Sequence, residues 1–175
     1  PSTLITVKPV KASETEDNYD PVKNDTDMII TAESIKEKVE SSDRDFLNGL
    51  IIRTLPNGPD KMTRRYSQDI PPFLSLEAMN YIRSLNIEHL LLDVPSVDRT
   101  FDEGKLSAHH IFWDVKSLSH DVNPDNCSAR TITEMVYVPD SVTDGKYFVS
   151  IQIPDFSSDA APSRVMLYEI AELPE

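Results

Sequence analysis

The sequence predicts an α/β fold, and three observations lead to this prediction. Apolar runs at 47–54 and 87–94 have the length of strands, and the apolar stripe of a helix lies between them at 75–85. Both runs are apolar at consecutive positions, as expected where a sheet is covered on both faces. This order of strand, helix and strand is typical of sheets with flanking helices. At 175 residues and without internal repeats, residues 1–175 are expected to form one domain.

The first elements follow from local patterns. Residues 4–10, LITVKPV, alternate in polarity and predict a strand, and the acidic stretch 11–27 predicts a loop with almost nothing to bury. A short apolar patch at 28–30 comes next. Thr31 is then expected to cap a helix over 32–40, because a threonine side chain can accept a hydrogen bond from an early helical amide.

A long loop follows the strand at 47–54. Residues 55–73 contain four prolines and one glycine, so this segment is expected to form a long loop outside the sheet. Loops of this length in compact domains are often functional. Ser75 is expected to cap the helix at 75–85, and the chain returns to the sheet at 87–94.

The last third of the chain predicts three more strands, at 131–138, 146–153 and 164–170. The first two are separated by VPDSVTDG, whose proline, aspartate and glycine residues favour a turn. Within 131–138, the alternation places Glu134 on the same face as apolar neighbours. A carboxylate on an apolar face needs a compensating partner.

Composition limits the partners. Seventeen lysines and arginines against thirty acidic residues give a net charge of −13, which disfavours nucleic acid and anionic membranes. The single cysteine, Cys127, cannot form an intramolecular disulfide, and no stretch approaches the roughly 20 apolar residues that span a bilayer. The chain also begins without the pattern of a signal peptide. These features favour a reducing cytoplasm.

Several enzyme classes lack their motifs in this sequence. There is no G-x-S-x-G elbow, no P-loop and no G-x-G-x-x-G fingerprint, which argues against serine hydrolases, NTPases and dinucleotide enzymes. Cys127 follows NPDN in an expected loop, and nothing in the adjacent sequence indicates an activated thiolate.

The remaining chemistry centres on His109, His110 and Glu134. Imidazole and carboxylate are suitable ligands for zinc or manganese, and a cation stabilises a carboxylate in an apolar site. Asp93 and Asp98 follow a buried strand, where open α/β sheets place their ligands.

The alternative interpretation is structural. In it, Asp98 and Arg99 form a surface pair in a turn, and His109 lines the start of a helix. Spacing alone does not decide between the two.

Four segments resemble, in the same order, blocks of the cyclase-like metal-dependent hydrolases, the family that includes bacterial kynurenine formamidase. They are LLLDVPSVDR, DEGKLSAHH, TITEMVYVPDSVTDGKYFVSIQIP and DAAPSRVMLY. Upstream, LNGLIIRT and PPFLSLEAMNYI also look like family segments, so the resemblance spans roughly residues 46–170. It implies mixed β-sheet layers with flanking helices, the swivelling β/β/α type of fold.

The resemblance also implies roles for individual residues. The metal ligands of the family match His109 and Glu134, which would bind one or two zinc or manganese ions. No catalytic residue can be assigned. The residues implied to shape the site or the substrate pocket are Asp93, Ser96 and Asp98 of the D-x-x-S-x-D turn, together with His110, whose ring is expected to face away and pack against the apolar run.

Three departures from the family pattern stand out. The principal metal motif, H-x-G-T-H-x-D-x-x-x-H, does not occur in this sequence. His109 and Glu134 are 25 positions apart where the family has about a dozen, so 114–130 is expected to contain an inserted loop. Leu55 replaces a glycine of the family, and a longer loop follows it, so substrate contacts are expected to differ.

We therefore expect these residues to be the C-terminal portion of a longer enzyme, inactive alone. The resemblance implies hydrolysis of an amide or related acyl bond in a small molecule, of the kind that arylformamidases perform in tryptophan catabolism. It also implies a homo-oligomer, a dimer or tetramer, with a separate N-terminal fragment as a further candidate partner. The alternative is a non-catalytic scaffold or oligomer subunit, because one His and one Glu are too few for a structural zinc site.

A distance tests the metal hypothesis. Typical metal–ligand bonds near 2 Å predict a separation of about 3–5 Å between the ligand atoms of His109 and Glu134.

Overall fold

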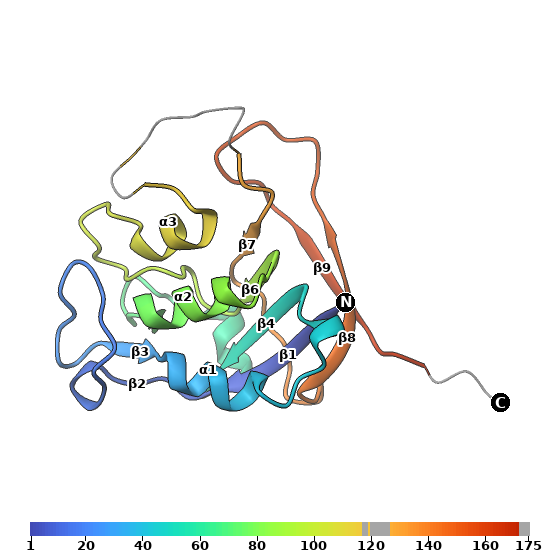
Figure 1. Cartoon of the computed structure of the whole chain (residues 1–175), viewed down its shortest axis with the longest axis horizontal. Coiled ribbons are helices and arrows are strands. Elements are labelled where there is room, and N and C mark those ends of the chain that lie inside the picture. The colour runs from blue at the N-terminus through green and yellow to red at the C-terminus, as the bar shows by residue number, and fades with distance from the viewer. Residues whose placement is uncertain (117–118, 120–126, 172–175) are drawn as a thin grey trace.

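The computed structural model describes residues 1–116, 119 and 127–171 and places their strands in two sheets (Figure 1). The larger sheet has six strands in the order β7-β6-β4-β1-β8-β9. Its strands are β1 (Ser2–Val7), β4 (Gly49–Thr54), β6 (His89–Leu92), β7 (Thr131–Thr133), β8 (Gly145–Gln152) and β9 (Arg164–Tyr168).

The larger sheet is mixed, as expected. Strands β1, β4, β6 and β7 run parallel to their neighbours, while β8 pairs antiparallel with β1 and β9 antiparallel with β8. The register places Leu4 beside Ile51 and Ile51 beside Leu91, one row across three strands. Because the parallel strands share a direction, their carboxyl ends meet at one edge of the sheet.

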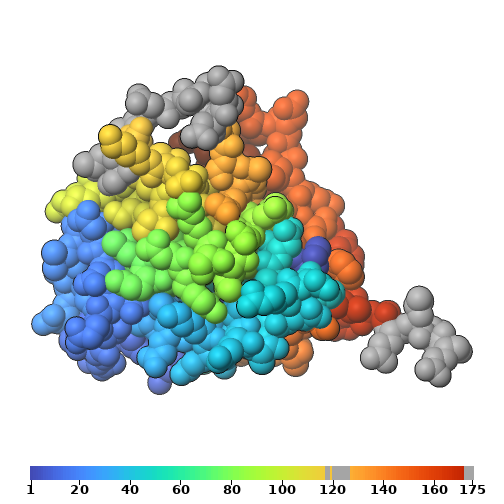
Figure 2. Space-filling model, in the orientation of Figure 1, coloured from blue at the N-terminus to red at the C-terminus, as the bar shows by residue number. Residues whose placement is uncertain are grey.

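Three helices cover one face of the larger sheet. They are α1 (Ala32–Val39), α2 (Leu76–Ser84) and α3 (Ser107–Trp113). Figure 2 shows this face, with α2 in green and α3 in yellow at the surface. Both predicted caps are confirmed, since the Thr31 side chain accepts a hydrogen bond from the amide of Ser34 and the Ser75 side chain from that of Ala78.

The core lies on both faces of the sheet, as the consecutive apolar residues of its strands predict. In β4, Leu50 and Ile52 are buried in the core beneath the helices, where Ile35 and Ile82 also lie. Ile51 faces the opposite way, into a second cluster. Each of these side chains is at most 1% exposed, and burying a residue of this size contributes about 1.5–3 kcal/mol.

A small second sheet corrects the prediction for 11–27. It consists of β2 (Val10–Lys11), β3 (Met28–Ile30) and β5 (Phe73–Leu74), with a short 3-10 helix at Ala12–Glu14. The acidic stretch does bury side chains, because Ala12 is 2% exposed and Tyr19 is 5% exposed. The Tyr19 ring packs edge-on against Phe73, with 4.7 Å between ring centroids. Composition therefore underestimated the packing of this segment.

The loops contain two more short helices and the predicted insertion. These are 3-10 helices at Arg44–Phe46 and, inside the proline-rich loop, at Pro59–Thr63. Much of the insertion expected at 114–130 lies outside the described residues. No helix in the described part of the chain is both long enough and apolar enough to cross a bilayer.

The prediction of a strand over 131–138 is wrong beyond Thr133. β7 ends there because Met135 adopts a positive φ of 61°, a left-handed conformation that a regular strand does not contain. Glu134 therefore lies just after the strand rather than within its alternation. Beyond it, the amides of Met135 and Val136 still donate to backbone carbonyls at the end of β6.

Candidate metal centre

The predicted ligands meet at the carboxyl edge of the parallel strands. After β6, the chain makes the D-x-x-S-x-D turn and then enters α3, which carries His109 on its first turn. Glu134 follows directly after β7, the strand that pairs with β6. The sheet thus brings together two residues that are far apart in the sequence.

His109 and Glu134 face one another across a short gap. Nε2 of His109 lies 3.6 Å from Oε1 of Glu134. This distance falls within the range of about 3–5 Å expected for two ligands of one ion. The two side chains are 14% and 29% exposed, and both line the same cleft.

Asp98 fixes the other side of the His109 ring. Its Oδ2 accepts hydrogen bonds from Nδ1 of His109 and, at 3.2 Å, from the His109 amide. Its Oδ1 accepts from the Tyr19 hydroxyl at 2.5 Å and from the Ala108 amide at 2.6 Å. The prediction of a surface pair with Arg99 is wrong, because the Asp98 side chain is 2% exposed and Arg99 binds Asp27 instead.

These contacts determine the charge of Asp98 and the tautomer of His109. Burial raises the pKa of the Asp98 carboxyl, but the hydrogen bonds from His109 and Tyr19 outweigh it and hold the pKa below its usual range. An ionised carboxylate only accepts hydrogen bonds. Neutral His109 must therefore carry its proton on Nδ1, which directs the lone pair of Nε2 toward Glu134.

Tyr19 supports this arrangement from the opposite side. Burial, followed by the nearby charge of Asp98, raises the pKa of the Tyr19 hydroxyl far above its usual value. The hydroxyl consequently remains protonated and donates to Asp98, while it accepts a hydrogen bond from the Arg99 amide at 3.1 Å.

Glu134 is a carboxylate in a partly desolvated position. Burial raises its pKa, and the interaction with His109 and the hydrogen bond from the Val97 amide, at 3.2 Å, partly offset that rise. In the neutral form of His109 that carries its proton on Nδ1, two acceptor atoms face each other across the gap. Zinc bonds near 2 Å at a tetrahedral angle separate ligand atoms by about 3.3 Å, close to what is seen here.

The donor set fits part of a divalent metal site. Imidazole nitrogen and carboxylate oxygen are both common zinc and manganese ligands. Within residues 1–116, 119 and 127–171, however, no group of three or more His, Cys, Asp or Glu side chains is placed to hold an ion. A complete coordination shell therefore needs donors beyond these described side chains, water or substrate among them.

The two residues open into a cleft of about 660 Å³. Its walls come from α3, from β7 and from the segment between β8 and β9, which rises beside β7 in Figure 1. The Trp113 ring packs against His109, with 5.0 Å between centroids, and its indole nitrogen donates to the Arg130 carbonyl at 3.0 Å. Thr131, Thr133 and Ser163 add hydroxyl groups to the lining.

Asp93 lies outside this constellation, whereas the Ser96 side chain hydrogen-bonds Glu134 and lowers the pKa of its carboxyl. Asp93 is fully buried and its carboxylate binds Lys61 at 2.7 Å and both the amide and the hydroxyl of Thr54, so it is not available as a ligand in the cleft. Ser96 accepts a hydrogen bond from the Asp98 amide at 3.1 Å and so shapes the turn, as expected.

His110 is 9% exposed and lines a different pocket, beside α2 and α3, from the cleft that contains Glu134. Phe112 is fully buried in the core. Cys127 is exposed.

Tyr19 and Lys61 were not predicted from the sequence as parts of these sites. A lone aromatic residue in the acidic stretch was a detectable signal for Tyr19, because a large apolar ring favours burial. Nothing local identifies Lys61, whose partner Asp93 is 32 positions away in sequence.

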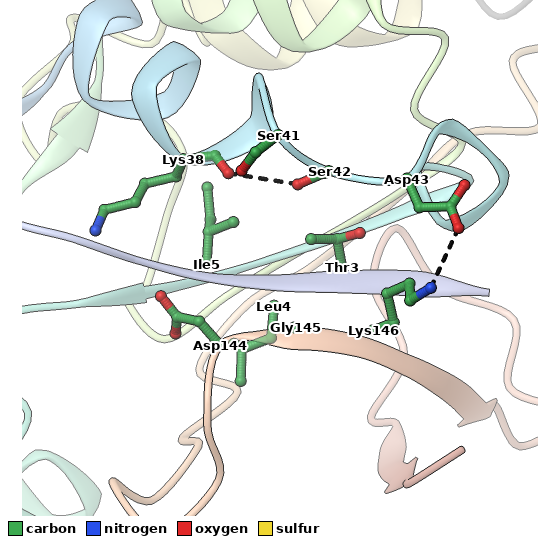
Figure 3. A pocket seen from close by; sticks show the side chains of 10 residues that line it. All are labelled: Thr3, Leu4, Ile5, Lys38, Ser41, Ser42, Asp43, Asp144, Gly145 and Lys146. Carbon is green, nitrogen blue, oxygen red and sulfur yellow. Dashed lines mark hydrogen bonds and ion pairs between the residues drawn. The ribbon is translucent and has the colours of Figure 1, made fainter. Parts of the chain in front are cut away.

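Another cavity, of about 350 Å³, lies beside β1 and the end of α1. Figure 3 shows Lys146 directed at Asp43, with 3.2 Å between the charged atoms, while Asp144 projects from the other side of β1. Asp144 is bound by Arg53 at 3.0 Å. This hollow brings together no histidine or cysteine side chain, so it is not a candidate for the metal chemistry considered above.

Comparison with known proteins gives a structural likeness. No protein-family model matches the chain, and no curated protein sequence matches it. Among solved structures, a predicted metal-dependent hydrolase from Bacillus stearothermophilus aligns with a TM-score of 0.55 and 18% identity, over 95% of this chain and 62% of the hydrolase. A potential metal-dependent hydrolase with cyclase activity aligns with a TM-score of 0.55 and 19% identity, over 95% of this chain and 63% of its own length.

These two structures share the fold of this chain, and the α/β prediction is confirmed at that level. The chain spans less than two thirds of the length of either hydrolase.

Proposed function

We propose that this chain provides part of the active site of a cyclase-like, metal-dependent hydrolase that cleaves an amide or a related acyl bond. The observation that carries the proposal is the orientation of His109, whose Nε2 is directed by Asp98 toward Glu134 inside a cleft. The likeness in fold to a predicted and a potential metal-dependent hydrolase supports it.

In the proposed enzyme, His109 and Glu134 hold a divalent ion, zinc or manganese. When bound, such an ion polarises a substrate carbonyl and lowers the pKa of a water molecule. We propose that this chain is part of a longer protein, which would supply the remaining ligands on a motif of the H-x-G-T-H type. We propose this because two side chains alone do not complete a coordination shell.

The chain's own residues would prepare the cleft for this chemistry. Asp98 holds the proton on Nδ1 of His109, so that Nε2 remains a ligand or a hydrogen-bond acceptor. If Glu134 does not bind the ion, its carboxylate can instead accept a hydrogen bond from water and act as a base, because burial raises its pKa. The Trp113 ring forms an apolar wall beside His109 that suits a planar group on the substrate.

As the substrate we propose an aryl amide such as an N-formyl aniline, by analogy with kynurenine formamidase. The Trp113 wall favours an aromatic group. The long loop after β4 separates this chain from the family pattern, so related acyl compounds belong in the same screen. We also propose a dimer or tetramer as the working form.

The second candidate function is a non-catalytic scaffold or oligomer subunit of the same fold. The observation in its favour is that the described residues supply two potential ligands rather than three. Under this alternative, His109 and Glu134 would stabilise the turn without binding an ion.

The deciding experiment uses the longest natural form of the protein, purified with zinc or manganese present. Metal content by elemental analysis and hydrolysis of formanilide would be measured together. We expect stoichiometric metal and activity, both reduced by Glu134→Gln and by His109→Ala, but not by Glu88→Gln, which alters an exposed carboxylate. Protein that retains no metal and cleaves no amide would support the scaffold.

A further inference from the structure

A further cavity lies at the carboxyl ends of β4 and β6, apart from the His109 cleft. Its volume is about 320 Å³, and it shares no lining residue with that cleft. It forms between Thr54 and Val94, which end or follow the two strands, and the proline-rich loop at 55–73. Open α/β sheets commonly bind ligands beyond the carboxyl ends of their strands.

The floor of this cavity is polar, but its polar groups already have hydrogen-bond partners within the protein. Nζ of Lys61 binds Oδ2 of Asp93 at 2.7 Å and the Thr54 hydroxyl at 2.8 Å, and it also donates to the Thr54 carbonyl. The three protons of an ammonium group are therefore in use. The side chains of Lys61 and Asp93 are 4% and 0% exposed, so the pair is neutral as a unit and closed to solvent.

The other cation that lines the cavity is balanced as well. Arg64 binds Asp60 at 2.5 Å and lies 3.4 Å from Asp69, which also lines the cavity. A charged ligand would meet a wall whose positive and negative groups are already paired. These two cations face three carboxylates, so the electrostatics favour a neutral ligand over an anion.

One polar group of the lining lacks a partner. The hydroxyl oxygen of Tyr66 is buried and, among the described residues, makes no hydrogen bond. Burial raises the pKa of this hydroxyl, so it stays protonated and can donate. A buried polar group without a partner is unfavourable, and an acceptor atom on a ligand would remove that penalty.

The rest of the wall is apolar and partly open. Met28, Leu55 and Ile70 line the cavity and are 37%, 42% and 54% exposed, although they are large hydrophobic residues. Pro56 and Pro72 add rigid apolar surface. A mostly apolar pocket with a few placed polar groups is the usual composition of a small-molecule site.

We propose that this cavity binds a small neutral molecule with an apolar body and one acceptor oxygen, such as a ketone or ester carbonyl, which takes a hydrogen bond from Tyr66. The apolar body lies against Met28, Leu55 and Ile70. The site is distinct from the proposed metal centre, and it does not depend on metal binding or on hydrolysis.

Acetophenone is a suitable probe because it is neutral, mainly apolar and has a single carbonyl. A titration of the ¹⁵N-labelled protein followed by ¹H–¹⁵N correlation spectra should give saturable shifts at the amides of Leu55, Tyr66 and Val94. Shifts confined to Thr133 and Met135, in the His109 cleft, would overturn the proposal, as would the lack of any saturable shift.

Tyr66→Phe tests the hydrogen bond. We expect it to weaken acetophenone binding about 3- to 10-fold, the range for one neutral hydrogen bond. Binding of ethylbenzene, which lacks an acceptor, should not change. The control Tyr168→Phe removes an exposed hydroxyl on β9 and should leave both affinities unchanged. Equal acetophenone binding by wild type and Tyr66→Phe, or tighter binding of benzoate than of acetophenone, would refute the assignment.

The unliganded Tyr66→Phe protein provides a second readout. Because the Tyr66 hydroxyl has no hydrogen bond to lose, the thermal midpoint of Tyr66→Phe should match or exceed that of the wild type. A clear decrease would mean that the hydroxyl is satisfied in the free protein, and the argument for a ligand acceptor would fail.

Discussion

Replacing Asp98 by asparagine exchanges one carboxylate oxygen for an amide NH₂ group where both oxygens accept hydrogen bonds. Oδ1 can go on accepting from Tyr19 and from the Ala108 amide. At the other position, the new NH₂ group faces two donors, the His109 amide and Nδ1–H of His109. The ring can respond by moving its proton to Nε2, which then points at Glu134.

The expected loss of unfolding free energy in Asp98→Asn follows from the hydrogen bonds that are lost. The Asp98 side chain is 2% exposed, so the His109 amide cannot readily find water in place of the carboxylate. Losing a charge-assisted hydrogen bond and leaving a buried donor unpaired lowers the free energy of unfolding by about 2–4 kcal/mol. For a chain of this size, that corresponds to a fall of roughly 5–15 °C in Tm.

The pH dependence has a definite sign. The pKa of Asp98 is held below its ordinary value of 3.8, so its carboxylate contributes stability that is fully present at neutral pH. That contribution is lost as the pH falls through the lowered pKa of the folded state. The difference in unfolding free energy between wild type and Asp98→Asn should therefore be largest near neutrality and should shrink below about pH 4.

Two measurements check this prediction. Urea unfolding followed by circular dichroism gives the stability difference, with the exposed Asp25→Asn as a control. Long-range ¹H–¹⁵N spectra of the histidine rings report the tautomer, which should change from Nδ1–H to Nε2–H in Asp98→Asn. Unchanged stability together with an unchanged His109 tautomer would refute the reasoning.

Three other substitutions give separate expectations. Lys61→Met leaves Asp93 as a buried unpaired charge and should lower the free energy of unfolding in urea by about 3–5 kcal/mol. Adding Asp93→Asn to Lys61→Met should recover part of this loss. Equal stability of the single and double variants would argue against this ion pair. Ser75→Ala removes the acceptor for the Ala78 amide at 2.9 Å and should lower the thermal midpoint by an amount equivalent to about 1 kcal/mol; an unchanged midpoint would mean that the cap is dispensable. Because burial raises the pKa of Glu134, Glu134→Gln should stabilise the metal-free protein at neutral pH. This gain should disappear at acid pH, where the Glu134 carboxyl is protonated in both the folded and the unfolded state. A loss of stability at pH 7 would contradict this sign.

The elements that could be predicted from sequence are those that depend on local chemistry. Thr31 and Ser75 precede amphipathic segments, and both cap the helices that follow them. The consecutive apolar residues of β4 and β6 correctly predicted that both faces of the sheet are covered. Local propensity and tertiary packing agree at these positions.

The parts that could not be predicted depend on contacts between distant residues. Tyr19 is 79 positions from Asp98, and its burial depends on a second sheet that short strands assemble. The positive φ of Met135 ends β7 one residue before Glu134, and neither residue is a glycine that would indicate such a turn.

For the candidate site, the family resemblance supplied the pairing of His109 with Glu134, and the observed distance agrees with it. Periodicity alone placed Glu134 on the face of a longer strand, which is wrong. The role of Asp98 as the partner of His109 required the structure, since the sequence pattern alone favoured a surface pair with Arg99.

The central claim is that His109 and Glu134 together bind a divalent ion, and a titration with Mn²⁺ tests it most directly. Mn²⁺ broadens the NMR signals of nearby nuclei, so the ¹⁵N-labelled chain locates its own site. We expect saturable broadening centred on residues 109 and 134 that Zn²⁺ relieves, that Glu134→Gln abolishes and that the exposed Glu37→Gln leaves intact. Broadening centred elsewhere, or broadening at His109 that persists in Glu134→Gln, would contradict the account.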